Sequence, residues 1–311
     1  MERIIALSDL MGAVHEAFEN LKSEKETNVS TLVENADDKK FGIAMVLTDG
    51  TVIKKGDVDT KFPIGSIAKM PLIELLLSQY GVDELLKKSG KCACMHKSHS
   101  EKPHIPVSRH GVRATSAVQP TGDPESKWNL IVDNMIDLMG SAPELNDKLY
   151  KKLTDINTQE NVVDTLAKAG YYLYDDAAMS VDLYTRQMAL DVTAEQLAVM
   201  AATVAADGVN PVTGKIVFDG ALAASVTGSL AAHGPHHANR PWLVGAGLPA
   251  VTDFGGGIVG VLPGVMGIAA YAPGLTPTGF TVKGAKALKY IMNKLGLSAF
   301  GSAKVTIDKN K

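Results

Sequence analysis

Residues 62–77 read FPIGSIAKMPLIELLL and place a serine hydroxyl and a lysine amine at the start of an apolar helix. Ser66 and Lys69 are three positions apart, and residues at that spacing share one face of a helix. A lysine amine in apolar surroundings loses the hydration of its charged form, so its pKa falls and the neutral amine can take the serine proton. The segment therefore predicts a Ser-x-x-Lys nucleophile for acyl transfer. The alternative is an ordinary helix start capped by Ser66.

Apolar strands are predicted on both sides of this segment in the sequence. Residues 41–53 contain two apolar runs around a turn at 49–50, and residues 258–271 contain two more around a turn at 263–264. A glycine run at 255–257 is expected to let the backbone approach a ligand or the nucleophile helix. These strands predict a central sheet next to Ser66.

Helical periodicity and polar composition divide the rest of the chain. Apolar residues recur at three- and four-residue spacing within residues 1–38, where an amphipathic helix leading into a second short one is expected, and throughout 128–205. The same spacing at 283–295 predicts a closing helix that packs on the sheet. Residues 89–127 are polar, show no periodicity and are predicted to form a long loop insertion.

Composition is typical of a soluble enzyme. The chain has 311 residues, of which 45% are hydrophobic, and this is enough for a large core. The net charge of −3 and the isoelectric point near 6.2 argue against nucleic acid or an anionic membrane as partner. No apolar run approaches the about 18 residues that span a bilayer, and acids near the N-terminus do not suit a secretory signal. Only two cysteines are present, which fits a reducing cytosol, so a cytoplasmic location is expected.

Three blocks of sequence carry a family pattern. They span residues 41–81, with Phe62-Pro-Ile-x-Ser-Ile-x-Lys69; residues 182–214, with DLYTRQ and GVNPVTG; and residues 247–284, with GLPA, GGIVGVLPGVMGI and a final VKG. By these blocks the chain resembles the serine-dependent glutaminases, which have the penicillin-binding and β-lactamase-like fold. The resemblance covers about residues 25–296 and is weak from about 85 to 180.

The resemblance implies an α+β (α/β/α) fold, in which an antiparallel sheet is flanked by helices and joined by a helical subdomain. It predicts a single catalytic unit over residues 1–311, made of a sheet subdomain (1–88 and 207–311), a helical subdomain (128–206) and a loop insertion (89–127).

The resemblance also implies the reaction and the site. Ser66 would attack the side-chain amide of glutamine or a related small-molecule amide, with Lys69 as base and the Ser66 backbone N–H as one oxyanion donor. No cofactor is implied, and a homo-oligomer is. The substrate-binding positions fall on Tyr184, Asn161, Asp133 (Asn134 with a one-residue shift), His236 and Phe254.

Several positions depart from the family pattern. The family's pocket glutamate falls on Thr154, and its Lys-Ser-Gly-Val strand becomes Val-Thr-Asp-Phe at 251–254. Val251 stands where the family has a lysine, and Asp253 stands where the family has a glycine. Together these two changes reverse the local charge. An acid near Ser66 would oppose the negative charge of the tetrahedral intermediate and would favour the protonated form of the dyad lysine. Phenylalanine in place of valine takes volume from the pocket.

These departures leave other functions open. A penicillin-recognising or esterase-like hydrolase on the same fold is one alternative, although the Lys-Thr/Ser-Gly strand that such enzymes use is missing. A catalytically silent homologue that acts as a binding protein is another. The cluster Cys92, Cys94, His96 and His99, with His104 and His110 following, could bind zinc, but its Cys-x-Cys spacing is tighter than usual, so incidental loop residues are the favoured interpretation. No metal site is predicted.

Overall fold

A computed structural model describes residues 2–25, 28–33, 36–89, 108–168, 172–235 and 239–311. The strands are β1 (Glu2–Ala6), β2 (Gly42–Leu47), β3 (Val52–Gly56), β4 (Phe62–Pro63), β5 (Glu144–Leu145), β6 (Leu190–Val192), β7 (Ala250–Thr252), β8 (Gly257–Leu262), β9 (Met266–Tyr271) and β10 (Lys304–Asp308). The α-helices are α1 (Leu7–Leu21), α2 (Lys69–Ser89, bent at Gly81), α3 (Arg109–Ala117), α4 (Pro124–Met139), α5 (Asp147–Gln159), α6 (Val162–Lys168), α7 (Ala177–Met188), α8 (Ala194–Ala205), α9 (Ala223–His233), α10 (Asn239–Ala246) and α11 (Val282–Lys294). Two short 3₁₀ segments are η1 (Gly65–Ala68) and η3 (Gly220–Leu222).

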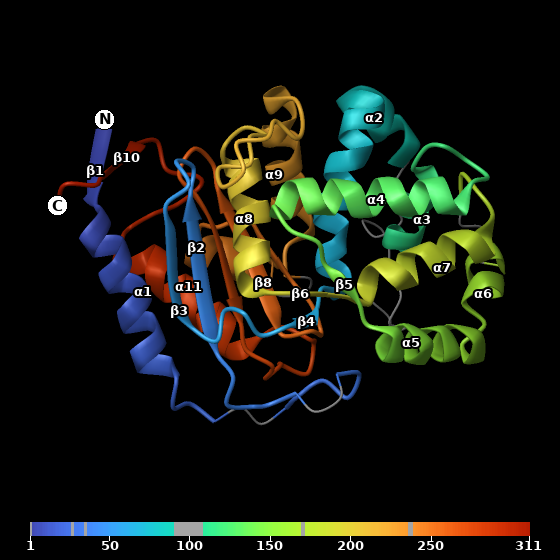
Figure 1. The fold of residues 1–311 in the computed structure, drawn as a ribbon, viewed down its shortest axis with the longest axis horizontal. Helices are drawn as coiled ribbons and strands as arrows, with labels where there is room; N and C mark the ends of the chain where they lie inside the picture. Colours follow the sequence, from blue (N-terminus) through green and yellow to red (C-terminus); the bar gives the residue numbers. More distant parts are fainter. Residues whose placement is uncertain (1, 26–27, 34–35, 90–107, 169–171, 236–238) are drawn as a thin grey trace.

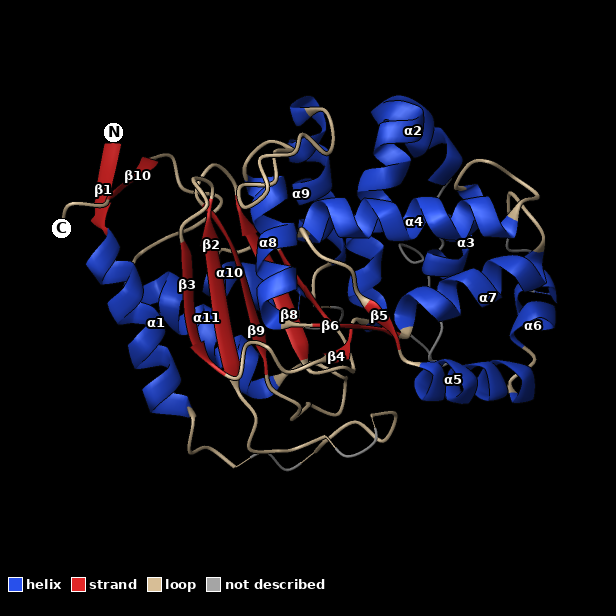
Figure 2. Ribbon diagram, in the orientation of Figure 1, coloured by secondary structure: helices blue, strands red, loops and turns tan. Residues whose placement is uncertain are grey.

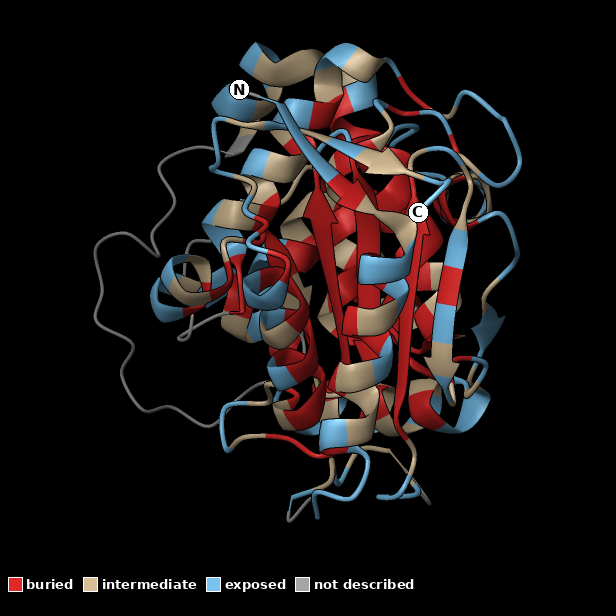
Figure 3. Cartoon of the chain, turned by 90° about the vertical axis from the view of Figure 1, so that its left-hand side faces the viewer, coloured by how far each residue is buried: buried red, intermediate tan, exposed pale blue. Residues whose placement is uncertain are grey.

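The centre of the molecule is a five-stranded antiparallel sheet with the order β3-β2-β9-β8-β7. Its two predicted hairpins are confirmed, with turns at Gly50 (φ 86°) and Gly264 (φ 70°), where glycine adopts a positive φ at little cost. Every residue of β2, β8 and β9 is buried, as Figure 3 shows for the central strands. These strands are apolar throughout because helices cover both faces of the sheet.

One face of the sheet packs on α1 and α11, and the other packs on α8 (Figures 1 and 2). The first predicted N-terminal helix and the closing helix are therefore confirmed, whereas the described residues between 22 and 38 do not form the second short helix that was expected. Helix α8 begins with a capping box between Thr193 and Gln196. It lies very close to β9, because a Cβ at Gly267 would be 2.2 Å from the Ala202 nitrogen.

Helices α2 to α7 form a helical region on the side of the sheet away from α1 (Figures 1 and 2). Helix α4 packs against both α2 and α8, and α7 packs against α3 and α5. A small sheet of order β4-β6-β5 connects this region to the segment that precedes Ser66. The fold is the predicted α+β arrangement, an antiparallel sheet flanked by helices with a helical region beside it.

The structure differs from the sequence predictions in three places. Residues 109–117, expected in the loop insertion, form α3, which Ser108 caps by accepting a hydrogen bond from the Gly111 N–H; only the N-terminal part of that insertion lies outside the described residues. Helix α8 was placed in the helical subdomain but covers the sheet. The parallel pair β1–β10 joins the two ends of the described chain and was not predicted, because each strand is short and mostly exposed.

A pair of glycine substitutions tests the packing of α8 on the sheet. Gly267→Ala should lower the free energy of unfolding by at least about 2 kcal/mol, because the new methyl group meets the α8 backbone, which cannot move aside. Gly228→Ala on α9 is the matched control, since its Cβ would meet nothing within 4 Å. That change should instead stabilise the protein by about 0.5–1 kcal/mol through helix propensity. Urea unfolding midpoints measure both changes, and a neutral Gly267→Ala would contradict the packing described.

Candidate active site

Ser66 lies on the 3₁₀ turn η1 between the short strand β4 and helix α2. Pairing of β4 with β6 holds the approach to this turn, and the Ile64 N–H donates to the Leu190 carbonyl at 2.8 Å. The Phe62 ring stacks on Tyr271 with centroids 4.4 Å apart, an interaction worth about 0.5–1.5 kcal/mol beyond burial. Ser66 lies within this 3₁₀ turn and Lys69 directly follows its last residue, so the two residues are about one helical turn apart.

The glycine run 255–257 allows a second backbone segment to reach the nucleophile turn. A Cβ at Gly255 would lie 1.9 Å from the Pro63 carbonyl oxygen, and one at Gly257 would lie 2.5 Å from Phe62 Cε2. Only glycine permits this approach. The structure thus confirms the expectation that the glycine run brings the backbone to the nucleophile segment.

Lys69 is half-buried at the first position of α2. Burial lowers the pKa of its amine, and the nearby charge of Asp253 raises it in part. No ion pair joins Lys69 to Asp253 in the portion of the chain that the structure describes. The lowered pKa favours loss of the proton from this amine, which is what a general base for serine needs. No hydrogen bond joins Ser66 Oγ directly to Lys69 Nζ among the described contacts.

Tyr184 is fully buried on α7 beside the hydroxyl groups of Ser66 and Ser108. Burial and the charge of Asp253 raise the pKa of the Tyr184 phenol well above its ordinary value, so the hydroxyl stays protonated. Within the described residues this hydroxyl has no hydrogen-bond partner. Helix α3 reaches the ring through Gly111, where a Cβ would lie 2.0 Å from Tyr184 Cζ. Sequence reasoning missed Ser108 and Gly111, because the polar segment around them carries no periodic pattern.

Asp253 directly follows β7 and is 7% exposed. Its carboxylate accepts hydrogen bonds from the backbone N–H groups of Ser66 and Phe254. Burial raises the pKa of Asp253, while the Ser66 hydroxyl, these N–H groups and the charge of Lys69 lower it in part. An acid therefore does lie beside Ser66, as the sequence indicated.

Phe254 and His110 lie next to the group formed by Ser66, Lys69, Tyr184 and Asp253. Phe254 is half-buried and packs against the cluster that contains Tyr184 and Val112. Burial lowers the pKa of His110, and the charges of Lys69 and His233 lower it further. His110, which was noted only in the Cys/His-rich segment, thus lies within electrostatic reach of the dyad.

The other predicted pocket positions lie as follows. Asp133 is exposed on α4, whereas its neighbour Asn134 donates to Glu74 Oε2 at 2.7 Å and to the Pro71 carbonyl at 3.1 Å, and so links α4 to α2. Asn161 is exposed between α5 and α6 and donates to Asp164. No described contact brings Asp133 or Asn161 to Ser66, and their binding roles stay predictions. His236 and the residues Cys92, Cys94, His96, His99 and His104 lie outside the described residues.

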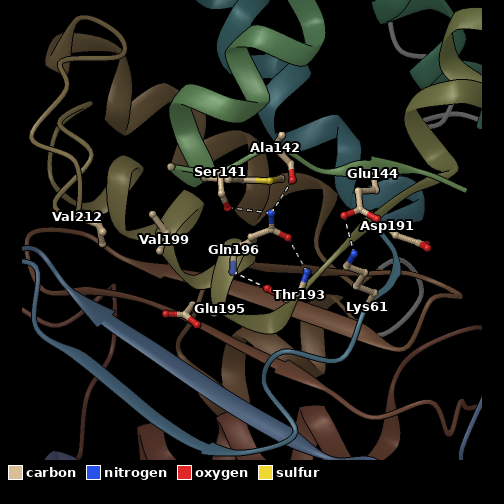
Figure 4. Close-up of a pocket in the computed structure, with 12 residues that line it drawn as sticks. Lys61, Ser141, Ala142, Glu144, Asp191, Thr193, Glu195, Gln196, Val199 and Val212 are labelled. Atoms are coloured by element: carbon tan, nitrogen blue, oxygen red, sulfur yellow. Dashed lines mark hydrogen bonds and ion pairs between the residues drawn. The ribbon is translucent and has the colours of Figure 1, made fainter.

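A surface pocket of about 310 Å³ lies elsewhere, between α4, α8 and the small sheet (Figure 4). Many of its polar groups already bond to one another. Gln196 donates to Ser141 Oγ and to the Ala142 carbonyl, and Lys61 pairs with Glu144 at 2.6 Å. Ser66, Lys69 and Tyr184 do not line it. In the described ranges no group of three or more potential metal ligands is found, and no helix is long and apolar enough to cross a bilayer.

Ser66 on a tight turn, the half-buried Lys69 three residues later and the buried Tyr184 beside the serine lie on a β-lactamase-like fold, and this is the arrangement expected for an acyl-transfer site of the Ser-x-x-Lys class. A model of the glutaminase family matches residues 26–300. A glutaminase of Bacteroides fragilis is 41% identical over 319 aligned positions, covering 99% of each chain. One of Bacteroides thetaiotaomicron is 42% identical, covering 96% of this chain and 97% of the relative. The chain belongs to the glutaminase family and is a hydrolase of that class.

Solved structures agree with this assignment. The structure of a probable glutaminase superimposes with a TM-score of 0.86 and 29% identity, covering 96% of this chain and all of that one. A probable glutaminase from Bacillus subtilis, solved with 6-diazo-5-oxo-L-norleucine, has the same fold, with a TM-score of 0.79, 21% identity and coverage of 96% and 99%.

Substitution of Gly111 tests whether the Tyr184 position matters for activity. In Gly111→Ala the methyl group would displace the Tyr184 ring, and a misplacement of about 1 Å costs on the order of a hundredfold in rate. Gly12→Ala on α1 is the control, because nothing lies within 4 Å of its Cβ. Steady-state ammonia release measures the effect. Full activity in a folded Gly111→Ala protein would show that Tyr184 tolerates movement and is not part of the machinery.

Proposed function

We propose that the protein hydrolyses L-glutamine to L-glutamate and ammonia through an acyl-Ser66 intermediate. Neutral Lys69 takes the Ser66 proton while Oγ attacks the side-chain amide carbon. The C–N bond then breaks, and ammonia leaves with the proton that Lys69 returns. Water hydrolyses the ester and restores Ser66. The observation that carries this proposal is the placement of Lys69 three residues after Ser66, where the 3₁₀ turn meets α2, together with the burial that lowers the pKa of Lys69.

Tyr184 supports the same reaction. Its buried phenol stays protonated and has no partner among the described groups, so it can donate a hydrogen bond to substrate or pass a proton at the leaving amide. The remaining binding roles are assigned by resemblance: Asp133, Asn161 and His236 toward the amino-acid end of the substrate, and Phe254 as a wall of the pocket next to Tyr184.

A related amide is the second candidate substrate. Asp253 contacts the Ser66 turn, and Phe254 packs in the cluster that contains Tyr184. At this wall of the pocket the family pattern has a positive charge and a valine, so both side chains depart from it. We further propose, from the resemblance and composition, that the protein is a cytoplasmic homo-oligomer, for which light scattering of the purified protein gives the mass.

The nucleophile and base are tested by single substitutions. Ser66→Ala should lower kcat for ammonia release from L-glutamine by about 10⁴ or more. Lys69→Arg should lower it by about 10²–10⁴, because a guanidinium does not give up its proton at working pH. Ser78→Ala on the same helix loses only a hydrogen bond to Glu74 and should keep its activity. A Ser66→Ala protein that still releases ammonia would disprove the assignment.

The pH dependence of acylation tests the link between Lys69 and Asp253. The base must be neutral, so the rate should rise with pH as Lys69 loses its proton. Because the Asp253 charge raises the pKa of Lys69, Asp253→Asn should let that pKa fall further and move the rising limb to lower pH. Asp191→Asn, a half-buried aspartate on β6, is the control and should leave the limb in place. If the rising limb of the pH–rate profile of Asp253→Asn stays in place or moves to higher pH, this coupling is contradicted.

A further inference from the structure

The Asp253 carboxylate accepts hydrogen bonds from two backbone N–H groups, one on the distant nucleophile turn and one on the next residue in the chain. Oδ2 accepts from the Ser66 N–H on the nucleophile turn, and Oδ1 accepts from the Phe254 N–H after β7. The side chain is more than nine-tenths buried, so these bonds are shielded from water. The Ser66 N–H is thus occupied by a carboxyl group that comes from a distant part of the chain.

The position of this carboxylate against the Ser66 N–H, called its seat below, depends on the residue before Ser66. A Cβ at Gly65 would lie 2.5 Å from Asp253 Cγ and 2.8 Å from Oδ1. Gly65 also has a φ of 54°, which side-chain-bearing residues rarely adopt. The carboxylate can therefore sit against the Ser66 N–H only because position 65 has no side chain.

Acyl transfer requires the Ser66 N–H as a hydrogen-bond donor. When Ser66 Oγ attacks a carbonyl, the carbonyl oxygen becomes negative, and N–H groups beside the nucleophile stabilise it. The Ser66 N–H is such a donor, and in this structure it already serves Asp253. A second negative charge in the same seat would be repelled. The buried Tyr184 hydroxyl next to Ser66 still lacks a partner among the described groups, so the surrounding site remains able to take a polar ligand.

We propose that the Asp253 carboxyl group occupies the oxyanion site of Ser66 and has to leave it before the serine can be acylated. This proposal rests on the proposed function, because it takes Ser66 as the nucleophile. It makes residue 253 a determinant of the acylation rate. The opposite role, Asp253 as a base for the Ser66 hydroxyl, predicts the reverse result and is separated by the same experiment.

Covalent labelling with an alkyl fluorophosphonate measures acylation without a known substrate. Ser66 Oγ forms a bond to phosphorus, the P–F bond breaks, and the fluoride and the serine proton leave. Intact-mass spectrometry follows the rate in the wild type, Asp253→Gly, Asp253→Asn, Ser66→Ala and the control Asp191→Asn. Asp253→Gly should be labelled about tenfold faster or more, since the loss of one oxyanion donor costs about 10²–10³ in rate. Asp253→Asn should fall between it and the wild type, because the amide keeps an acceptor in the seat without the charge.

The outcomes separate the two proposals. Labelling of Ser66→Ala at the wild-type rate would overturn the nucleophile assignment itself. If Ser66→Ala is unlabelled but Asp253→Gly is labelled no faster than wild type, only the role of Asp253 as an occupant is overturned. A slower Asp253→Gly would identify the carboxylate as a base instead.

A measurement independent of activity tests the seat. Gly65→Ala should lower the Tm of the wild type more than it lowers the Tm of Asp253→Gly, because the clash with the carboxylate exists only in the wild type whereas the backbone strain exists in both. Equal losses in the two backgrounds would overturn the proposed dependence of the Asp253 seat on Gly65.

Discussion

The close approach of the glycine run 255–257 to β4 is the contact on which the site depends. It brings the segment after β7 against the turn that carries Ser66, within a distance that no side chain at Gly255 would allow. Because β7 belongs to the central sheet and β4 leads into the helical region, this contact links the two parts of the fold, as the packing of α4 on α8 also does. The nucleophile, its lysine and Asp253 meet at that junction.

Burial then determines the charges at the junction. Desolvation lowers the pKa of Lys69 and raises the pKa of both Asp253 and Tyr184, so each of the three groups is shifted toward its neutral form. A neutral amine suits a base and a neutral phenol suits a donor. The carboxylate is the group that does not fit this pattern of serine hydrolysis, and its hydrogen bonds to backbone N–H groups explain how it is tolerated.

Local patterns predicted the parts of the chain whose structure depends on neighbours in sequence. The hairpins at 49–50 and 263–264, the N-terminal and closing helices and the Ser66–Lys69 spacing all follow from short-range periodicity and turn chemistry. The same reasoning failed for α3, because its buried apolar residues, Val112 and Ala117, are too few to give a clear helical periodicity. It also failed for β1–β10, where two exposed strands far apart in sequence pair with each other.

Residue type and spacing were enough to indicate the family, the Ser66–Lys69 pair and an acid near Ser66. The contacts of that acid follow only from three-dimensional packing. A single residue at 253 could point to solvent, to Lys69 or to the backbone. The choice depends on the glycine at 65 and on the Ser66 N–H, which long-range packing brings to the carboxylate, while the Phe254 N–H is its neighbour in sequence. Such a seat forms between segments almost two hundred positions apart, so no local pattern can reveal it.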